Sequence, residues 1–94
     1  NYCKGQGANM YRIETKIVNE IGLHARSVSE FVKIAANYKS TVFLEYMGRP
    51  INAKSVVGLL AAAIPKESEI AIYAMGPDED KVVNELVKFI ENDF

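Results

Sequence analysis

The segment GLHAR, residues 22–26, holds the side chains of this sequence that are best suited to chemistry. His24 is the single histidine of the chain, and apolar residues at three- and four-residue spacing follow it, which predicts that a helix starts here. The first N–H groups of a helix have no partner within it, and together with the helix dipole they favour anions. Arg26 adds a guanidinium that is suited to phosphate oxygens. This pattern favours a histidine that accepts a phosphoryl group.

A purely structural interpretation of the same residues stays open, because a lone histidine is more often structural than functional. Gly22 would then form a turn, Leu23 would pack in the core, and His24 and Arg26 would be solvated surface groups. No metal-ligand cluster or glycine-rich nucleotide loop accompanies the histidine, and the chain has one cysteine. We therefore expect no metal and no cofactor, and a carrier that other enzymes act on rather than an enzyme.

Ser55, in the segment NAKSVVGLL, is a second candidate. Serine is a favoured N-cap, worth about 1 kcal/mol relative to alanine, so a helix start explains Ser55 without any function. A phosphate on Ser55 would instead add about −1.5 to −2 charges at that helix start. Val56, Val57 and Leu60 cannot all point inward from one short helix. We interpret these three residues either as loose core packing or as an exposed docking patch.

The apolar periodicity predicts the elements that must position these residues. Alternation with a period of two predicts strands over 11–17, 41–46, 49–52 and 69–74, and helical spacing predicts helices over about 25–38, 55–65 and 78–90. The order is β-α-β-β-α-β-α. Each helix has one apolar stripe, so an α+β fold with an antiparallel sheet covered on one face by helices is expected. Residues 1–9 lack periodicity, and we expect a flexible N-terminal extension, native or left over from cloning, ahead of one domain over 10–94.

Charge and length limit the classes of function that remain. The 94 residues carry 11 basic and 12 acidic side chains, for a net charge of −1, which lacks the basic footprint of a nucleic-acid-binding domain. No apolar run is long enough to span a membrane, and no secretory leader is visible. A chain of this size has one small core and no room for a buried substrate cavity. We expect a cytoplasmic monomer that acts at its surface, without direct contact to nucleic acid and without insertion into membranes.

The segments GLHAR and NAKSVVG, in this order and at this separation, resemble the phosphorylation-site and regulatory-serine motifs of the HPr family. These are the histidine-containing phosphocarrier proteins of the bacterial sugar phosphotransferase system. The resemblance spans residues 10–94 and includes LEYMGR and EIAIYAMGPDED. It implies an open-faced β-sandwich with a four-stranded antiparallel sheet and three helices on one face. It also implies that Enzyme I phosphorylates His24, ultimately from phosphoenolpyruvate, with Arg26 beside the phosphoryl group. A-type domains of Enzyme II sugar permeases would then receive the group.

The resemblance further implies regulation and a partner surface. In the Gram-positive branch of the family, an HPr kinase/phosphorylase would phosphorylate Ser55 with ATP, and the product would bind a catabolite-control transcription regulator as a corepressor. Carried over by position, the partner surface consists of Ala25, Ser29, Lys33, Val56, Val57 and Leu60.

Two residues depart from the family pattern. Ser27 stands where the family usually has proline, and Glu30 stands where many relatives have an apolar residue. Proline suits a first helical turn, so we expect Ser27 to loosen the chain at the helix start while it restores a backbone donor. These departures leave open an HPr-like regulatory paralogue that acts mainly as a Ser55-phosphorylated corepressor. A small α/β interaction domain with a coincidental motif is a third interpretation.

Overall fold

The computed structural model describes residues 2–4, 10–18 and 22–92, and for 2–4 it describes the backbone. The helices and strands in these ranges are β1 (Tyr2–Lys4), β2 (Tyr11–Lys16), α1 (Ala25–Ala36), β3 (Thr41–Tyr46), β4 (Arg49–Asn52), α2 (Val56–Ala62), β5 (Glu69–Met75) and α3 (Glu79–Glu91). From β2 onward this is the predicted order β-α-β-β-α-β-α, and the ends agree with the predicted ones to within a few residues.

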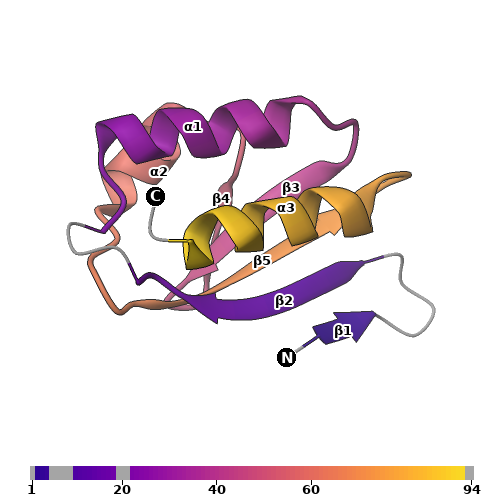
Figure 1. Cartoon of the computed structure of the whole chain (residues 1–94), viewed down its shortest axis with the longest axis horizontal. Coiled ribbons are helices and arrows are strands. Elements are labelled where there is room, and N and C mark those ends of the chain that lie inside the picture. The colour runs from indigo at the N-terminus through magenta and orange to yellow at the C-terminus, as the bar shows by residue number, and fades with distance from the viewer. Residues whose placement is uncertain (1, 5–9, 19–21, 93–94) are drawn as a thin grey trace.

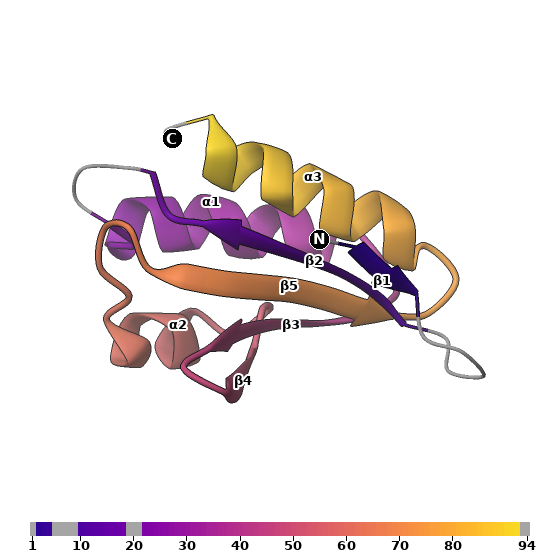
Figure 2. The same ribbon diagram turned by 90° about the horizontal axis from the view of Figure 1, so that it is seen from below.

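The strands form one antiparallel sheet in the order β1-β2-β5-β3-β4. α1 and α3 lie side by side over one face of the sheet, and α2 packs against α1 and β4 (Figures 1 and 2). The predicted four-stranded antiparallel sheet with three helices is therefore confirmed for β2 to β5. Among the described residues, no helix is both long enough and apolar enough to cross a membrane.

β1 extends the sheet beyond what the sequence predicts. Its backbone pairs with β2 in the register Tyr2↔Ile13, Cys3↔Arg12 and Lys4↔Tyr11. Without it, β2 would be an edge strand with a row of unpaired backbone groups, which readily recruits another strand. The expectation that the N-terminal extension stays outside the fold therefore does not hold for Tyr2–Lys4. Residues 1 and 5–9 lie outside the described residues, where this expectation stays a prediction.

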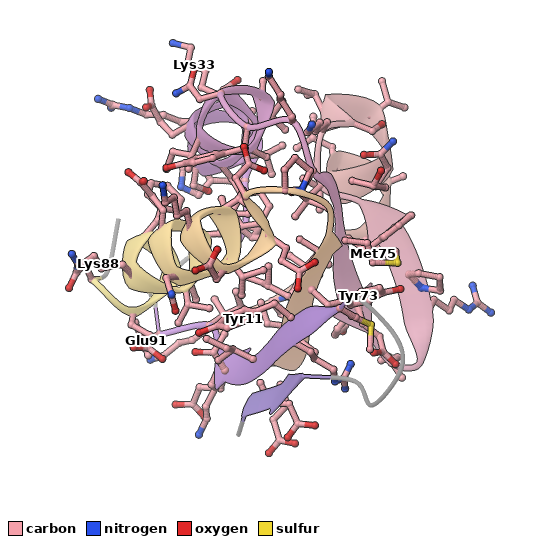
Figure 3. All side chains as sticks on the ribbon, turned by 90° about the vertical axis from the view of Figure 1, so that its right-hand side faces the viewer. Tyr11, Lys33, Tyr73, Met75, Lys88 and Glu91 are labelled. Carbon is pink, nitrogen blue, oxygen red and sulfur yellow. The ribbon has the colours of Figure 1, made fainter. Side chains whose placement is uncertain are left out.

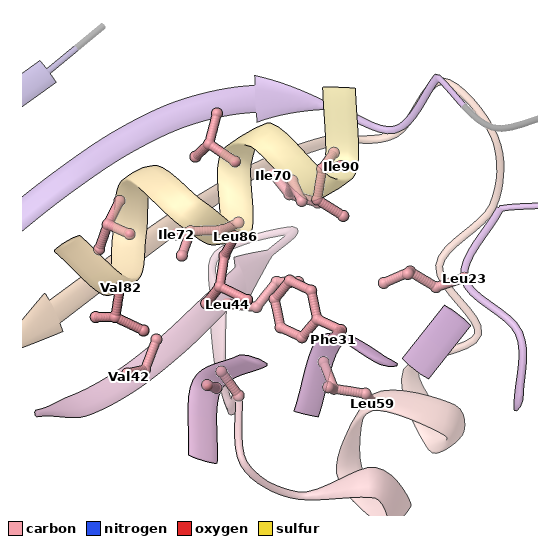
Figure 4. Packing of buried hydrophobic residues seen from close by; sticks show 14 of the residues in the cluster. Leu23, Phe31, Val42, Leu44, Leu59, Ile70, Ile72, Val82, Leu86 and Ile90 are labelled. Carbon is pink, nitrogen blue, oxygen red and sulfur yellow. The ribbon is translucent and has the colours of Figure 1, made fainter. Parts of the chain in front are cut away.

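One apolar core lies between the helices and the sheet (Figure 4). α1, β3 and α3 contribute the apolar stripes that their periodicity predicts, and Phe31, Leu44 and Leu86 are fully buried. Leu59 joins the same cluster and is the single buried residue of α2. The open face of the sheet carries polar and aromatic rows instead, including the stacked rings of Phe43 and Tyr73, whose centroids are 5.4 Å apart.

Asp78 fastens the start of α3 to the segment that leads into β3. Its carboxylate accepts hydrogen bonds from the backbone N–H groups of Lys39 and Ser40, both at 3.0 Å, and from the Ser40 hydroxyl. The hydroxyl bond and then the backbone bonds stabilise the charged carboxylate, which lowers the pKa of Asp78 to about 2. Asp78 thus joins two segments that are 38 residues apart in the sequence.

Gly22 fastens the segment before α1 to the loop after α2. Its φ is +81°, and a Cβ atom there would lie 2.7 Å from the carbonyl oxygen of Ile64 and 3.0 Å from the backbone nitrogen of Lys66. The next residue, Leu23, donates its N–H to the same Ile64 carbonyl at 3.0 Å. Only glycine permits both this backbone conformation and this close approach.

We predict that Asp78→Asn lowers the melting temperature at pH 7, because an amide cannot accept all three hydrogen bonds. The folded-state pKa lies below the ordinary value of 3.8. The stability gained from the charge is therefore present above about pH 4 and is lost as the pH falls through about 2. Thermal melts of both proteins across this range should show the difference closing at the acid end. A difference that keeps its full size at pH 2 would contradict this role for the charge.

Gly22→Ala should destabilise the fold more than Gly48→Ala does. Both glycines have positive φ, so both alanines carry a left-handed backbone penalty of about 1–2 kcal/mol. The Cβ atom at position 48 would have nothing within 4 Å, whereas at position 22 it would meet backbone atoms. Urea unfolding of the two variants separates the contact from the backbone penalty. Equal losses would show that the approach to residues 64–66 relaxes without cost.

Candidate functional site

His24 is the N-cap of α1, as its position in the sequence predicts. Its backbone is extended, with φ −128° and ψ 179°, and its carbonyl accepts the N–H of Val28 at 2.8 Å, which closes the first turn. The residue is partly exposed. The N–H groups of Ala25 and Arg26 belong to the first turn, where no intrahelical acceptor exists. The imidazole therefore sits at the start of a helix of 12 residues, at the end that attracts anions.

Ser27 holds the backbone of His24 in place. Its hydroxyl accepts the N–H of His24 at 3.0 Å and donates to the His24 carbonyl oxygen at 3.1 Å. The side chain is buried, with 4% exposed. The expectation that Ser27 loosens the helix start is therefore wrong, because a serine at this position can reach back to the N-cap. In a capping box the side chain at this position reaches back to the N-cap N–H, usually from glutamate or glutamine, and here Ser27 makes that bond.

The other α1 residues assigned to the partner surface share one exposed side. Ala25, Ser29 and Lys33 follow each other at four-residue spacing, and all three are exposed. Lys33 points away from the body of the molecule (Figure 3), and its Nζ lies 4.0 Å from the carboxylate of Glu30. Arg26 is exposed as well. Glu30 thus partly offsets the positive charge of this side.

Ser55 is the N-cap of α2, and its hydroxyl oxygen accepts the N–H of Gly58 at 3.0 Å. The capping role that the sequence predicts is confirmed, and Ser55 is partly buried. Exposed fractions of 37% for Val56, 78% for Val57 and 40% for Leu60 exclude loose core packing for these side chains. α2 therefore buries Leu59 and presents an apolar patch to solvent.

α1 and α2 pack side by side and run in opposite directions. The loop after α2 meets the start of α1 through the bond between Leu23 and Ile64. At the other end, Lys54 donates from Nζ to the carbonyl oxygen of Tyr38 at 2.9 Å, just beyond α1. Ser55 consequently lies at the end of α2 that is remote from His24. We call seven exposed residues of the two helices the carrier face: Ala25, Arg26, Ser29, Lys33, Val56, Val57 and Leu60.

A shallow concavity lies on the open face of the sheet, away from the helices. It is lined in part by Arg12, Glu14, Glu45 and Ala71. Arg12 is already paired there, at 2.6 Å from Glu45 and 3.3 Å from Glu14. Within residues 2–4, 10–18 and 22–92, no group of His, Cys, Asp or Glu side chains could hold a metal ion. His24 is not among the residues that line this concavity.

Comparisons with known proteins agree with this geometry. Residues 11–92 match the family model described as the PTS HPr component phosphorylation site. The chain is 34% identical to the phosphocarrier protein HPr of Cupriavidus necator, over 90% of this chain and 96% of the relative. It is 33% identical to the HPr-like protein Crh of Bacillus subtilis, over 87% of this chain and 94% of the relative.

A solved structure of a relative has a similar fold. The crystal structure of HPr-C-His from Thermoanaerobacter tengcongensis superimposes with a TM-score of 0.85 and 31% identity, over 88% of this chain and 93% of that one. Both the sequence match and the fold cover nearly all of the described residues. The chain therefore belongs to the HPr family, whose members carry phosphoryl groups rather than act as enzymes.

Proposed function

We propose that the chain accepts a phosphoryl group on His24 from Enzyme I, which is charged by phosphoenolpyruvate, and passes it to A-type domains of Enzyme II sugar permeases. The observation that carries the proposal is the position of the only histidine, partly exposed at the N-cap of α1. In this role the protein works in the cytoplasm as a monomer and needs no metal or cofactor.

The transfer uses the lone pair of one ring nitrogen of His24, by analogy with the family Nδ1. This nitrogen attacks phosphorus, an N–P bond forms, and the bond to the donor group of Enzyme I breaks with its electron pair going to the donor. Transfer to an Enzyme II domain reverses the roles of donor and acceptor. A preorganised positive environment lowers the barrier to both steps, because charge on the phosphoryl oxygens is met without rearrangement.

Two groups of this chain provide that environment. The N–H groups at the start of α1 point beyond the helix end, where a phosphoryl group on His24 would lie. The exposed guanidinium of Arg26 follows two residues later and offers a fork of donors to phosphate oxygens. Arg26 would stabilise the transferred group in this scheme.

The carrier face provides the docking surface for the partners. Val57 is 78% exposed, and an apolar side chain this accessible gains most from burial against another protein. Arg26 and Lys33 add positive charge on α1, which would attract partners with acidic surfaces and raise their association rates. Enzyme I and the A-type domains would therefore share one surface and bind it in turn.

The regulatory alternative rests on Ser55. The HPr-like protein Crh of Bacillus subtilis is about as similar to this chain as the HPr protein of Cupriavidus necator is. The partly buried Ser55 hydroxyl stands next to the apolar patch of α2. Phosphorylation by an HPr kinase/phosphorylase would add negative charge there and create a form that binds a catabolite-control transcription regulator. The presence of His24 favours the carrier as the main function.

The first test is His24→Ala. The side chain is partly exposed and is not part of the buried core, so this variant should fold like the wild type. It should take no phosphate from Enzyme I and phosphoenolpyruvate, whereas the wild type should take acid-labile phosphate at His24. Mass spectrometry of both proteins locates the label. Full labelling of the variant would overturn the assignment of His24.

Ser55→Asp should slow the phosphorylation of His24 by Enzyme I, because the added charge lies beside the patch that docks the partner. Ser55→Ala should keep the wild-type rate while it loses about 1 kcal/mol of stability with the cap. Initial rates for the three proteins, together with thermal melts, separate the two effects. Equal rates in all three, and failure of a purified HPr kinase to modify the wild type, would leave Ser55 as a helix cap only.

A further inference from the structure

One hydroxyl group holds both backbone polar groups of His24. Ser27 Oγ accepts the His24 N–H at 3.0 Å and donates to the His24 carbonyl oxygen at 3.1 Å. The carbonyl also accepts from Val28, as any N-cap carbonyl does. The N–H of His24 lies before the helix, so the helix provides no acceptor for it. The Ser27 hydroxyl is thus the group that fixes this N–H.

The two bonds restrain both backbone torsions of His24. The N–H moves with φ and the carbonyl moves with ψ, and both are tied to the same atom. The direction of the Cα–Cβ bond follows from these torsions, so the hydroxyl limits where the imidazole can go. Because Ser27 is 4% exposed, its side chain offers little surface for direct contact with a docked partner.

From this geometry we propose that Ser27 is a positioning residue for phosphoryl transfer, which acts through the backbone of His24. The proposal rests on the function proposed above, that His24 accepts the phosphoryl group. In-line attack needs the ring nitrogen at the correct distance and angle from phosphorus, and a displacement of about 1 Å can lower a rate about a hundredfold. A backbone that is free to rotate at His24 would place the ring correctly for only part of the time.

A merely structural role for Ser27 predicts something different. Loss of the hydroxyl would then lower the stability of α1 and leave the chemistry of the folded protein unchanged. The two interpretations separate in the kinetics, because a positioning role lowers kcat with the carrier as substrate of Enzyme I and leaves KM near its wild-type value.

The experiment compares Ser27→Ala with Ser27→Thr, which keeps the hydroxyl, and with Ser40→Ala as a matched control. Ser40 is also a buried serine with a bonded hydroxyl, but it lies beyond the opposite end of α1. All proteins are assayed with Enzyme I and phosphoenolpyruvate below their melting temperatures. We expect Ser27→Ala to lower kcat about tenfold or more, Ser27→Thr to restore it, and Ser40→Ala to lose stability without losing kcat.

Hydrogen exchange of the His24 amide gives a second measurement that does not depend on the fit of threonine. It should be faster in Ser27→Ala than in the wild type, and unchanged in Ser40→Ala. A Ser27→Ala protein with wild-type kcat, or a loss of kcat equal to that of Ser40→Ala, would overturn the positioning role and leave the function of His24 intact. A wild type that takes no label on His24 would overturn both proposals.

Discussion

The junction between the loop before α1 and its first turn is the constraint on which the rest of the structure depends. In the function proposed above, His24 must be accessible to other proteins, so deep burial cannot hold it. Its backbone is held instead, through the Leu23–Ile64 bond on one side and the Ser27 hydroxyl on the other. A partly exposed side chain on a fixed backbone would suit a group that large partner proteins phosphorylate and dephosphorylate in turn.

Packing in the core restrains the two helices that meet at this junction. Phe31 of α1 and Leu59 of α2 lie in the same buried cluster as the inner residues of the sheet, so the two helices cannot shift independently. Gly22 brings the loop before α1 within contact of the residues after α2, and Asp78 fixes the start of α3 to the entry of β3. Because these contacts fix the frame, α2 can expose Val57 and its neighbours to solvent while Leu59 anchors the helix.

Periodicity and capping rules predict the frame and the position of His24, because both are local properties of the chain. The stripe around Phe31 and the alternation around Leu44 locate their elements, and the serine before VVG identifies a cap. The two bonds of Ser27 were not predicted, since they depend on a side-chain rotamer that reaches backward along the helix. The pairing of β1 was also missed, because Tyr2–Lys4 carry no alternating pattern and their pairing depends on the edge that β2 offers. The bonds of Asp78 to Ser40 span 38 residues, which local patterns do not report.

The most direct test of a phosphoryl group held at the start of α1 is nuclear magnetic resonance of the ¹⁵N-labelled protein after phosphorylation by Enzyme I and phosphoenolpyruvate. We expect phosphorus coupling to one ring nitrogen of His24, with the largest amide shifts at Ala25, Arg26 and Ser27. Phosphate on any other residue, or a phosphorylated His24 that leaves these amides unshifted, would contradict this expectation.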